Sequence, residues 1–301
     1  MTLLHANGGE GFIGFLGEVI LDGVIDTLKL IPFLFLTYLL MEFIEHKASA
    51  RVLGSIKKAG PLGPLPASLV GAIPQCGFSA AAANLYTGKV ITLGTLVAVF
   101  LSTSDEMLPI LIAGNITAGN ILIILAYKII VAIAVGFALD AILRLLGRDK
   151  DDINIDEICD ADDCHCERGI FHSAIHHTLT TGLFILAVTL SINAIVFAIG
   201  EEALAGIMYE KPFVSHLIAS FFGLIPNCAA SVTLATLASE GLITVGTMLS
   251  GLFSGSGVGV LVLLRVNKNQ KQNLMIILLL VLCGFAFGVL ADFVPFLANL
   301  I

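Results

Sequence analysis

The sequence predicts an all-α integral membrane protein made of two inverted-topology repeats, each with a re-entrant hairpin or discontinuous helices meeting near the membrane midplane. Hydrophobic residues make up 57% of the 301 residues and charged residues only 13%, a composition that soluble domains do not show. The second half of the chain also repeats the first without a gap, at a spacing of 152 residues. A half-length repeat in an apolar chain is typical of membrane transporters.

The repeat is clearest between Ala67 and Ser104. This segment shares 15 of 38 positions with residues 219–256, and the shared positions include Pro74 and Cys76, which apolar composition alone would rarely align. The repeat divides the chain into three predicted regions. They are a first transmembrane repeat at 1–146, a cytoplasmic acidic Cys/His loop at 147–169 and a second transmembrane repeat at 170–301.

The first half begins with an amphipathic segment at 11–27 that leads into an apolar stretch at 28–44, and the two together predict one spanning helix. The repeated segment then places Pro74-Gln75-Cys76 between two short apolar runs. A longer apolar run is interrupted at Ser102–Glu106, and a spanning helix at 120–146 ends this half.

The second half opens with an apolar helix at about 170–200. Its copy of the hairpin tip reads Pro226-Asn227-Cys228, and its long apolar run is interrupted by the Gly-rich segment 254–259. A basic loop then precedes the last span, at 273–299. Every break of the first half therefore has a counterpart in the second.

Positive charge decides the predicted topology. Lys and Arg gather in three segments, which the positive-inside rule makes cytoplasmic, whereas 114–119 has no Lys or Arg. The chain between residues 58 and 114 must then cross the membrane an odd number of times, yet it is too short for three crossings of about 20 residues each. A re-entrant hairpin followed by one broken spanning helix meets both conditions. The expected cytoplasmic segments, in a cell (plasma) membrane, are 47–58, 147–169 and 265–273.

The breaks predict the site, because unpaired backbone groups cannot face lipid and are tolerated at mid-membrane only where they line a polar cavity. Asp105 and Glu106 lie in one break, in an apolar segment without Lys or Arg to pair with them, and this favours a cationic substrate. Capping of a helix start is the alternative role for these carboxylates. The residues expected to bind substrate are Gln75, Cys76, Ser102, Ser104, Asp105, Glu106, Asn227, Cys228, Ser254 and Ser256.

The candidate metal ligands combine hard and soft donors. Carboxylate, amide and hydroxyl oxygens suit Mn²⁺, whereas cysteine sulfur suits Zn²⁺, Cd²⁺ or As(III). The mixture favours Mn²⁺ or a borderline divalent ion, and close packing of small residues is the other explanation for the cysteines. Arsenite would require a third thiolate, for which Cys283 is the candidate within the membrane. The expected metal ligands are Asp105, Glu106, Gln75, Cys76, Asn227 and Cys228.

Three motifs carry a resemblance to a known family. Residues 71–79 (Gly-Ala-Ile-Pro-Gln-Cys-Gly-Phe-Ser), 103–109 (Thr-Ser-Asp-Glu-Met-Leu-Pro) and 225–228 (Ile-Pro-Asn-Cys) resemble the ten-helix heavy-metal exporter family, also labelled arsenic-efflux-like permeases or manganese transporters. The resemblance covers essentially the whole chain and implies efflux of a metal or metalloid. We therefore expect a secondary active transporter with no enzymatic activity and no cofactor, since the metal is the cargo.

Two pairs of side chains one helical turn apart are candidates for access, exit or proton coupling: Asp22 with Asp26, and His172 with His176. A solvated helix face and a position at the membrane interface are the respective alternatives. The middle loop is expected to capture metal ions or to regulate transport, with an acidic linker as the alternative. Its candidate ligands are Cys159, Cys164, His165 and Cys166.

Two other transport functions stay open. An arsenite or organoarsenical permease would use Cys76 and Cys228, and a carrier of organic anions would use the amide groups of the hairpin tips. Against an anion carrier, only Lys128 lies well inside a span, and we expect it to pair with Asp140 or to extend to the interface.

The expected partners are a divalent metal or metalloid ion and the lipid bilayer, and a homodimer stays open. The sequence contains no metalloprotease, hydrolase or nucleotide-binding motif. Its net charge of −8 is not set against a basic face, which excludes a general nucleic-acid partner.

Overall fold

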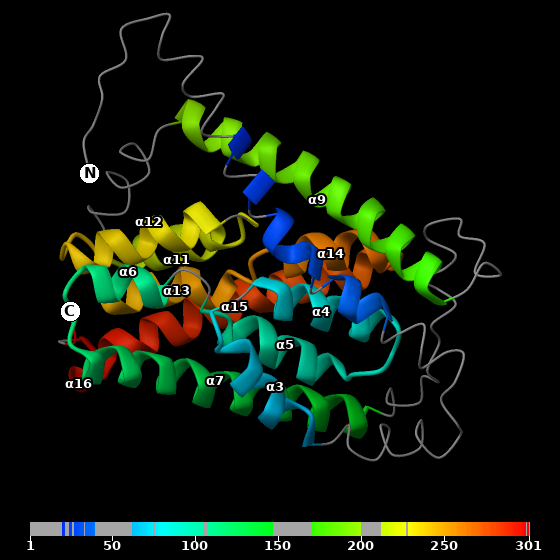
Figure 1. The fold of residues 1–301 in the computed structure, drawn as a ribbon. Coiled ribbons are helices and arrows are strands. Elements are labelled where there is room, and N and C mark those ends of the chain that lie inside the picture. The colour runs from blue at the N-terminus through cyan, green and yellow to red at the C-terminus, as the bar shows by residue number, and fades with distance from the viewer. Residues whose placement is uncertain are drawn as a thin grey trace, which may run out of the picture.

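The computed structural model describes most of the chain as helices (Figure 1). The described residues are 20–21, 24–25, 27–32, 34–39, 62–74, 76–104, 107–146, 170–199, 212–226, 228–298 and 300. The helices are α3 (Pro64–Gly71), α4 (Cys76–Thr87), α5 (Leu93–Ser102), α6 (Met107–Ala113), α7 (Ala118–Leu145), α9 (Ile170–Ile199), α11 (Pro212–Gly223), α12 (Cys228–Ser239), α13 (Val245–Ser254), α14 (Gly259–Val266), α15 (Gln270–Phe293) and α16 (Pro295–Ala298).

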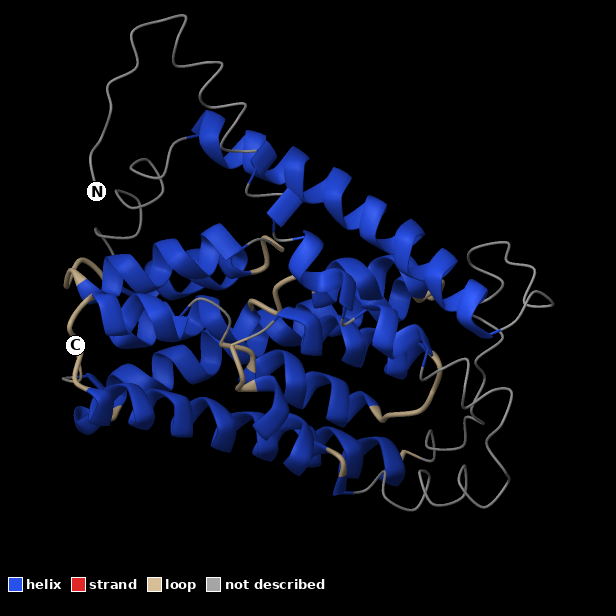
Figure 2. Cartoon of the chain, in the orientation of Figure 1, coloured by secondary structure: helices blue, strands red, loops and turns tan. Residues whose placement is uncertain are grey.

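The predicted all-α membrane class is confirmed. Figure 2 shows helices and loops but no strand in the part of the chain that the structure describes. Five helices are long and apolar enough to cross a membrane, when α5 with α6 and α13 with α14 are each counted as one broken span. They are Leu93–Ala113, Ala118–Leu145, Ala174–Ser191, Val245–Val266 and Gln270–Phe293.

The helix bounds reproduce the sequence repeat. Adding 152 to the bounds of α4 and α5 gives those of α12 and α13, and the break after α5 corresponds to the break after α13. In Figure 1, α4, α5 and α14 lie toward one end of the molecule, whereas α6, α12 and α13 lie toward the other. Contacts agree with this view, because α14 packs on α4 and α12 packs on α6. The inverted relation of the two halves to the membrane stays a prediction.

The hairpin helices are too short to cross a bilayer. α3 has 8 residues and α4 has 12, which correspond to about 12 and 18 Å at the usual helical rise, against a hydrocarbon core of about 30 Å. α11 and α12 have 12 residues each. These lengths fit the two predicted re-entrant hairpins.

The broken helices form the centre of the bundle. All ten residues of α5 and all ten of α13 are buried, and each helix packs along its long neighbour, α5 on α7 and α13 on α15. A helix that is apolar on every side must be enclosed by other helices. The long neighbours carry the outward apolar side chains that suit contact with lipid, among them Leu122, Ile130 and Ile142 on α7 and Leu278, Leu282 and Leu290 on α15.

A carboxylate, buried in Asp140 and half-buried in Asp292, fixes the start of each central helix. Asp140 of α7 accepts hydrogen bonds from the Thr92 hydroxyl (2.7 Å) and from the Gly94 amide (2.9 Å). The equivalent Asp292 of α15 accepts from Thr244 (2.6 Å) and Gly246 (2.8 Å). These carboxylates accept hydrogen bonds from amides that have no partner within the helix, and their negative charge stabilises the positive end of the helix dipole at the first turns of α5 and α13.

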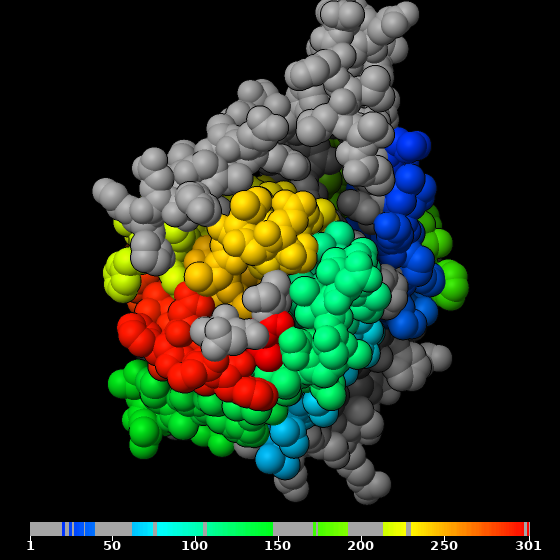
Figure 3. Space-filling model, turned by 90° about the vertical axis from the view of Figure 1, so that its left-hand side faces the viewer, coloured from blue at the N-terminus to red at the C-terminus, as the bar shows by residue number. Residues whose placement is uncertain are grey.

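The two ends of the molecule are joined by contacts between distant segments. At one end, the Tyr86 hydroxyl bonds to the Gln272 side-chain amide, which places the end of α4 beside the start of α15. At the other end, Asn120 donates to the Leu300 carbonyl (2.6 Å). Figure 3 looks onto this second end, where the ends of α6 and α12 lie side by side. The three segments expected to be cytoplasmic all adjoin helix ends at the first end of the bundle.

Candidate functional site

Eight helix ends surround the middle of the bundle. α3, α5, α11 and α13 end there, and α4, α6, α12 and α14 begin there, as Figure 1 shows. The C-terminal ends bring free carbonyl groups with partial negative charge, and the N-terminal ends bring free amides with partial positive charge. Such a group of half-helix ends suits an ion that must be bound and released.

Hydroxyl side chains form hydrogen bonds at the C-terminal end of α5, where the first broken helix is interrupted. Ser102 and Thr103 donate back to the Val99 carbonyl at 3.0 and 2.8 Å, as serine and threonine do at helix ends. The next residue, Ser104, donates to the Ala72 carbonyl (2.8 Å) and so ties the break to the tip of the first hairpin. All three hydroxyl residues are buried.

The second break has a related but less polar structure. Ser254 donates to the Ser250 carbonyl (3.0 Å), and the Gly255 amide donates to the Gly251 carbonyl (2.8 Å). Gly257 adopts a φ of 54°, a left-handed conformation that glycine adopts without strain. Ser256 is 2% exposed, and its hydroxyl oxygen has no hydrogen-bond partner. A buried polar group without a partner is a position where a water or an ion is expected.

The hairpins pack against the broken helices through glycine. A Cβ at Gly71 would lie 2.3 Å from Ser102 Oγ and 2.7 Å from the Val99 carbonyl oxygen. A Cβ at the equivalent Gly223 would lie 2.0 Å from the carbonyl oxygen of Gly251. Only glycine allows these backbones to approach, so both hairpin tips are held directly against the breaks.

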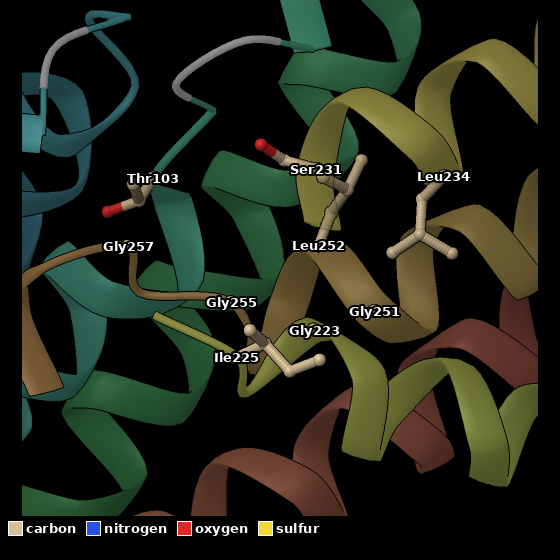
Figure 4. A pocket seen from close by; sticks show the side chains of 9 residues that line it. All are labelled: Thr103, Gly223, Ile225, Ser231, Leu234, Gly251, Leu252, Gly255 and Gly257. Atoms are coloured by element: carbon tan, nitrogen blue, oxygen red, sulfur yellow. The ribbon is translucent and has the colours of Figure 1, made fainter. Parts of the chain in front are cut away.

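A small cavity lies between the two breaks (Figure 4). The space open to the centre of a water molecule is about 20 Å³, enough for one water or one ion of similar size. Figure 4 shows Thr103 of the first break on one side of the view and Ser231 and Leu234 of α12 on the other. The lining residues are Thr103, Gly223, Ile225, Ser231, Leu234, Gly251, Leu252, Gly255 and Gly257.

Lys128 takes a different position from the one the sequence predicts. Its ammonium donates to the carbonyl of Thr103 and to that of Leu252 (3.1 Å), and it lies 5.8 Å from the ring centre of Phe253. Asp140 is twelve residues further along α7, about 18 Å away. The side chain of Lys128 has 0% exposure. It therefore neither pairs with Asp140 nor extends to the interface, and both of those expectations are wrong.

The position of Lys128 also corrects the argument that Asp105 and Glu106 lack a positively charged partner and therefore require a cationic substrate. The sequence segment around Asp105 contains no Lys or Arg, but α7 brings an ammonium to Thr103, two residues before Asp105. Positive charge is therefore available beside the break from another helix.

Four of the predicted substrate-binding residues are described with their side chains, two at each break. Ser102, Ser104, Ser254 and Ser256 are buried at the two breaks. Cys76 and Cys228 begin α4 and α12, where the structure describes the backbone alone. The remaining candidates lie outside the described residues: Gln75, Asp105, Glu106 and Asn227 of the central site, Asp22 and Asp26, and Cys159, Cys164, His165 and Cys166 of the loop.

The histidines of α9 differ in their surroundings. His172 and His176 are exposed. His177, which is 1% exposed, stacks on Tyr38 at 5.2 Å between ring centres, and the Tyr38 hydroxyl bonds to Thr181 (2.8 Å). Within the described residues, no three side chains of His, Cys, Asp or Glu converge to hold a metal.

Sequence reasoning missed the role of the paired carboxylates Asp140 and Asp292. The signal was available, because these residues are 152 apart, as are Thr92 and Thr244, which bond to them. A carboxylate that recurs in both halves at the start of a central helix is expected to support the helix. The second copy differs in that His216 Nε2 lies 3.1 Å from Asp292 Oδ2, where the first half has Pro64.

These features define a class of protein: a multi-pass membrane transporter with a central site at broken helices. A family model described as "Putative, 10TM heavy-metal exporter" matches residues 18–202, which is more than half of the chain. The chain belongs to this family, and the resemblance carried by the motifs at 71–79 and 103–109 is confirmed. The motif at 225–228 lies outside the matched residues, so coverage of essentially the whole chain stays a prediction. Comparison with curated proteins and with solved structures finds no match.

The family's description gives ten transmembrane helices, although the family model matches helical segments only up to residue 202. Counting each broken helix once and leaving out the four-residue α16, the described residues contain ten such segments. They are Thr27–Leu39, α3, α4, α5 with α6, α7, α9, α11, α12, α13 with α14, and α15. The hairpin helices α3, α4, α11 and α12 are the ones too short to cross a bilayer.

Proposed function

We propose that this heavy-metal exporter moves a divalent cation out of the cytoplasm by secondary active transport, with Mn²⁺ as the favoured substrate and Zn²⁺ or Cd²⁺ as related ones. One observation supports the proposal most. The break that contains Asp105 and Glu106 starts beside Thr103, which lines a one-ion cavity together with residues of α11, α12, α13 and the second break. Hydroxyl residues of both halves, Thr103 and Ser231, are among the lining residues. Carboxylate, hydroxyl and carbonyl oxygens are the donors that Mn²⁺ prefers.

In the proposed site, Asp105 and Glu106 supply the charge, and Gln75, Cys76, Asn227 and Cys228 at the two hairpin tips complete the ligand set. Ser102, Ser104, Ser254 and Ser256 would hold the substrate or its remaining waters, as hydroxyl groups do around hard cations. Support comes from the Ser104–Ala72 hydrogen bond, which ties one hairpin tip to the break that carries the acids.

The protein is proposed to lie in the plasma membrane with 47–58, 147–169 and 265–273 on the cytoplasmic side. The metal would then reach the site from the end of the bundle where the loops after α7 and α14 lie. His172 and His176, at the start of α9, are proposed to attract metal at this end. The Cys159–Cys166 loop is proposed to supply it.

The test is Mn²⁺ uptake into inverted vesicles that contain the purified protein. Asp105→Asn and Glu106→Gln should each lower uptake at least tenfold, because each removes one of the two carboxylates that supply the negative charge of the proposed site. Glu240→Gln is the matched control, since Glu240 is an exposed carboxylate between α12 and α13. Undiminished uptake by both site variants would contradict the assignment.

The two other substrate classes give different results in the same vesicles. An arsenite permease would lose arsenite transport in Cys76→Ser and Cys228→Ser and would be indifferent to Mn²⁺. A carboxylate carrier has one specific observation in its favour, the ammonium of Lys128 beside the cavity. It would take up labelled dicarboxylates, and Asp105→Asn would not abolish that uptake.

A further inference from the structure

Lys128 places a positive charge where the two halves meet. Its ammonium bonds to the carbonyls of Thr103 and Leu252, and both of these residues line the cavity. Thr103 is the C-cap of α5, and Leu252 lies in the last turn of α13. Two helix C-terminal ends, which carry partial negative charge, therefore already hold a cation.

The charged residues of the bundle separate into two groups when the halves are compared. Asp140 and Asp292 recur at the spacing of 152 and support the starts of the central helices. Three charged residues at or beside the first break do not recur: Asp105 and Glu106 correspond to Gly257 and Val258, and Lys128 corresponds to Leu280. At this break, the charges without a counterpart are thus two acids and one ammonium, and the ammonium is bonded to Thr103, two residues before the first acid in the sequence.

We propose that the Lys128 ammonium is a tethered counter-cation of the transport site: it neutralises the site after the metal has left and is displaced when a metal binds. The inference rests on the proposed function. Asp105 follows Thr103 by two residues in the chain, so a divalent metal held by this break and an ammonium bonded to Thr103 would repel each other in a medium of low dielectric constant. This repulsion disfavours a state in which the metal ion and the Lys128 ammonium are both at the break, so binding of one displaces the other.

This exchange serves the return of the empty carrier. Bare carboxylates in an apolar bundle are costly, and a transporter that has released its metal must still reorient. α5, α6 and α13 contain no side chain that titrates, and α15 contributes Cys283, Asp292 and Lys271 along its length. Lys128 of α7 is therefore the described cation that lies at the break and can neutralise it.

Two transport measurements separate this role from a purely structural one. Net Mn²⁺ efflux from loaded vesicles requires the empty carrier to return, whereas exchange of labelled Mn²⁺ for unlabelled Mn²⁺ does not. In Lys128→Met, which keeps the length of the side chain but removes its charge, net efflux should fall at least tenfold. Exchange should stay within about twofold of the wild-type rate, and half-saturation should occur at a lower Mn²⁺ concentration because the competitor is gone.

Two matched variants complete the experiment. Lys128→Arg keeps the charge and should retain at least a third of the net efflux. Leu280→Met changes the equivalent buried position of the second half and should leave both rates unchanged. If Lys128→Met loses exchange together with net efflux, or keeps both, the inference is overturned.

If Lys128→Met does not fold, as judged by gel filtration, Lys128→Arg decides alone. Loss of net efflux with exchange retained in Lys128→Arg would overturn the role of charge, and retention of both supports it. Absence of Mn²⁺ exchange in the wild-type protein would instead contradict the proposed function.

Discussion

Gly94 makes a contact that no larger residue could make. A Cβ at this position would lie 2.2 Å from the Gly136 carbonyl oxygen and 2.5 Å from the carboxyl group of Asp140. Gly246 has the same relation to Asp292, at 2.3 Å. Because the amides of these glycines donate to the carboxylates, the absence of a side chain lets α5 approach α7 and α13 approach α15 closely enough to bond.

Gly94→Ala should therefore destabilise the protein. The added methyl group must displace backbone or the Asp140 carboxyl, which costs about 1–3 kcal/mol or more in a packed interior. The thermal midpoint of the purified protein in detergent should fall clearly. Gly119→Ala is the control, because a Cβ at Gly119 of α7 meets nothing within 4 Å, and alanine favours the helix by about 0.5–1 kcal/mol. An equal loss in both variants would refute the packing argument.

The hairpins are the elements that distinguish this fold from ten full crossings. The sequence predicts them from the number of residues between two charged loops, and the observed lengths of α3 and α4 agree. The breaks could also be predicted, because proline and runs of serine and glycine stop helices at defined positions. Two helices end at 71 and 223, three residues before a proline, and two end at 102 and 254, where the serine and glycine runs begin.

Cysteine labelling tests whether the first hairpin returns to its own side. In a cysteine-free background, Leu62→Cys before α3 and Lys89→Cys after α4 should both react with a membrane-impermeant maleimide from the cytoplasmic side. Glu240→Cys, at the corresponding end of the second hairpin, should react only from the outside. Reaction of the first two positions from opposite sides would show that the α3–α4 pair crosses the membrane an odd number of times.

At the scale of the whole molecule, α9 and the segment 27–39 form a pair beside the bundle. Tyr38 and His177 stack within this pair, and the ring of Phe35 meets that of Phe171 at 5.5 Å. In Figure 1, α9 runs diagonally across one side of the other helices. Its main contact with the described bundle is with α14, where Arg265 lies 5.2 Å from the ring centre of Phe184. Among the numbered helices of the described residues, the large contacts therefore lie within the bundle, and α9 has a smaller contact with α14.

A reversible cross-link across this boundary should arrest transport if the bundle moves against the pair. Phe184→Cys combined with Arg265→Cys, joined by a short bifunctional thiol reagent, should lower Mn²⁺ efflux at least tenfold. Efflux should return when a reducible linker is cleaved. Each single-cysteine variant, treated with the same reagent, is the control. Full efflux by the linked protein would mean that α9 and α14 do not separate during transport.

The surroundings of Lys128 show where sequence reasoning stops. Its two carbonyl partners are 25 and 124 residues away in the chain, and backbone carbonyls leave no trace in residue types. The nearest carboxylate on the same helix, Asp140, was the natural partner by sequence, but it bonds to Thr92 and Gly94 instead. The positions of the breaks follow from the sequence, whereas the hydrogen bonds between them depend on how two distant halves meet.

The position of the breaks also determines how the membrane voltage acts on the cargo. α5 and α13 each have ten residues before their breaks, about 15 Å of a hydrocarbon core of about 30 Å. A doubly charged ion that reaches the middle crosses about half of the electric field, which amounts to about 2.3 kcal/mol per 100 mV. A cytoplasm that is electrically negative therefore opposes binding of the metal ion from the cytoplasmic side. The half-saturating metal concentration should change roughly 40-fold for each 100 mV imposed across the vesicle membrane.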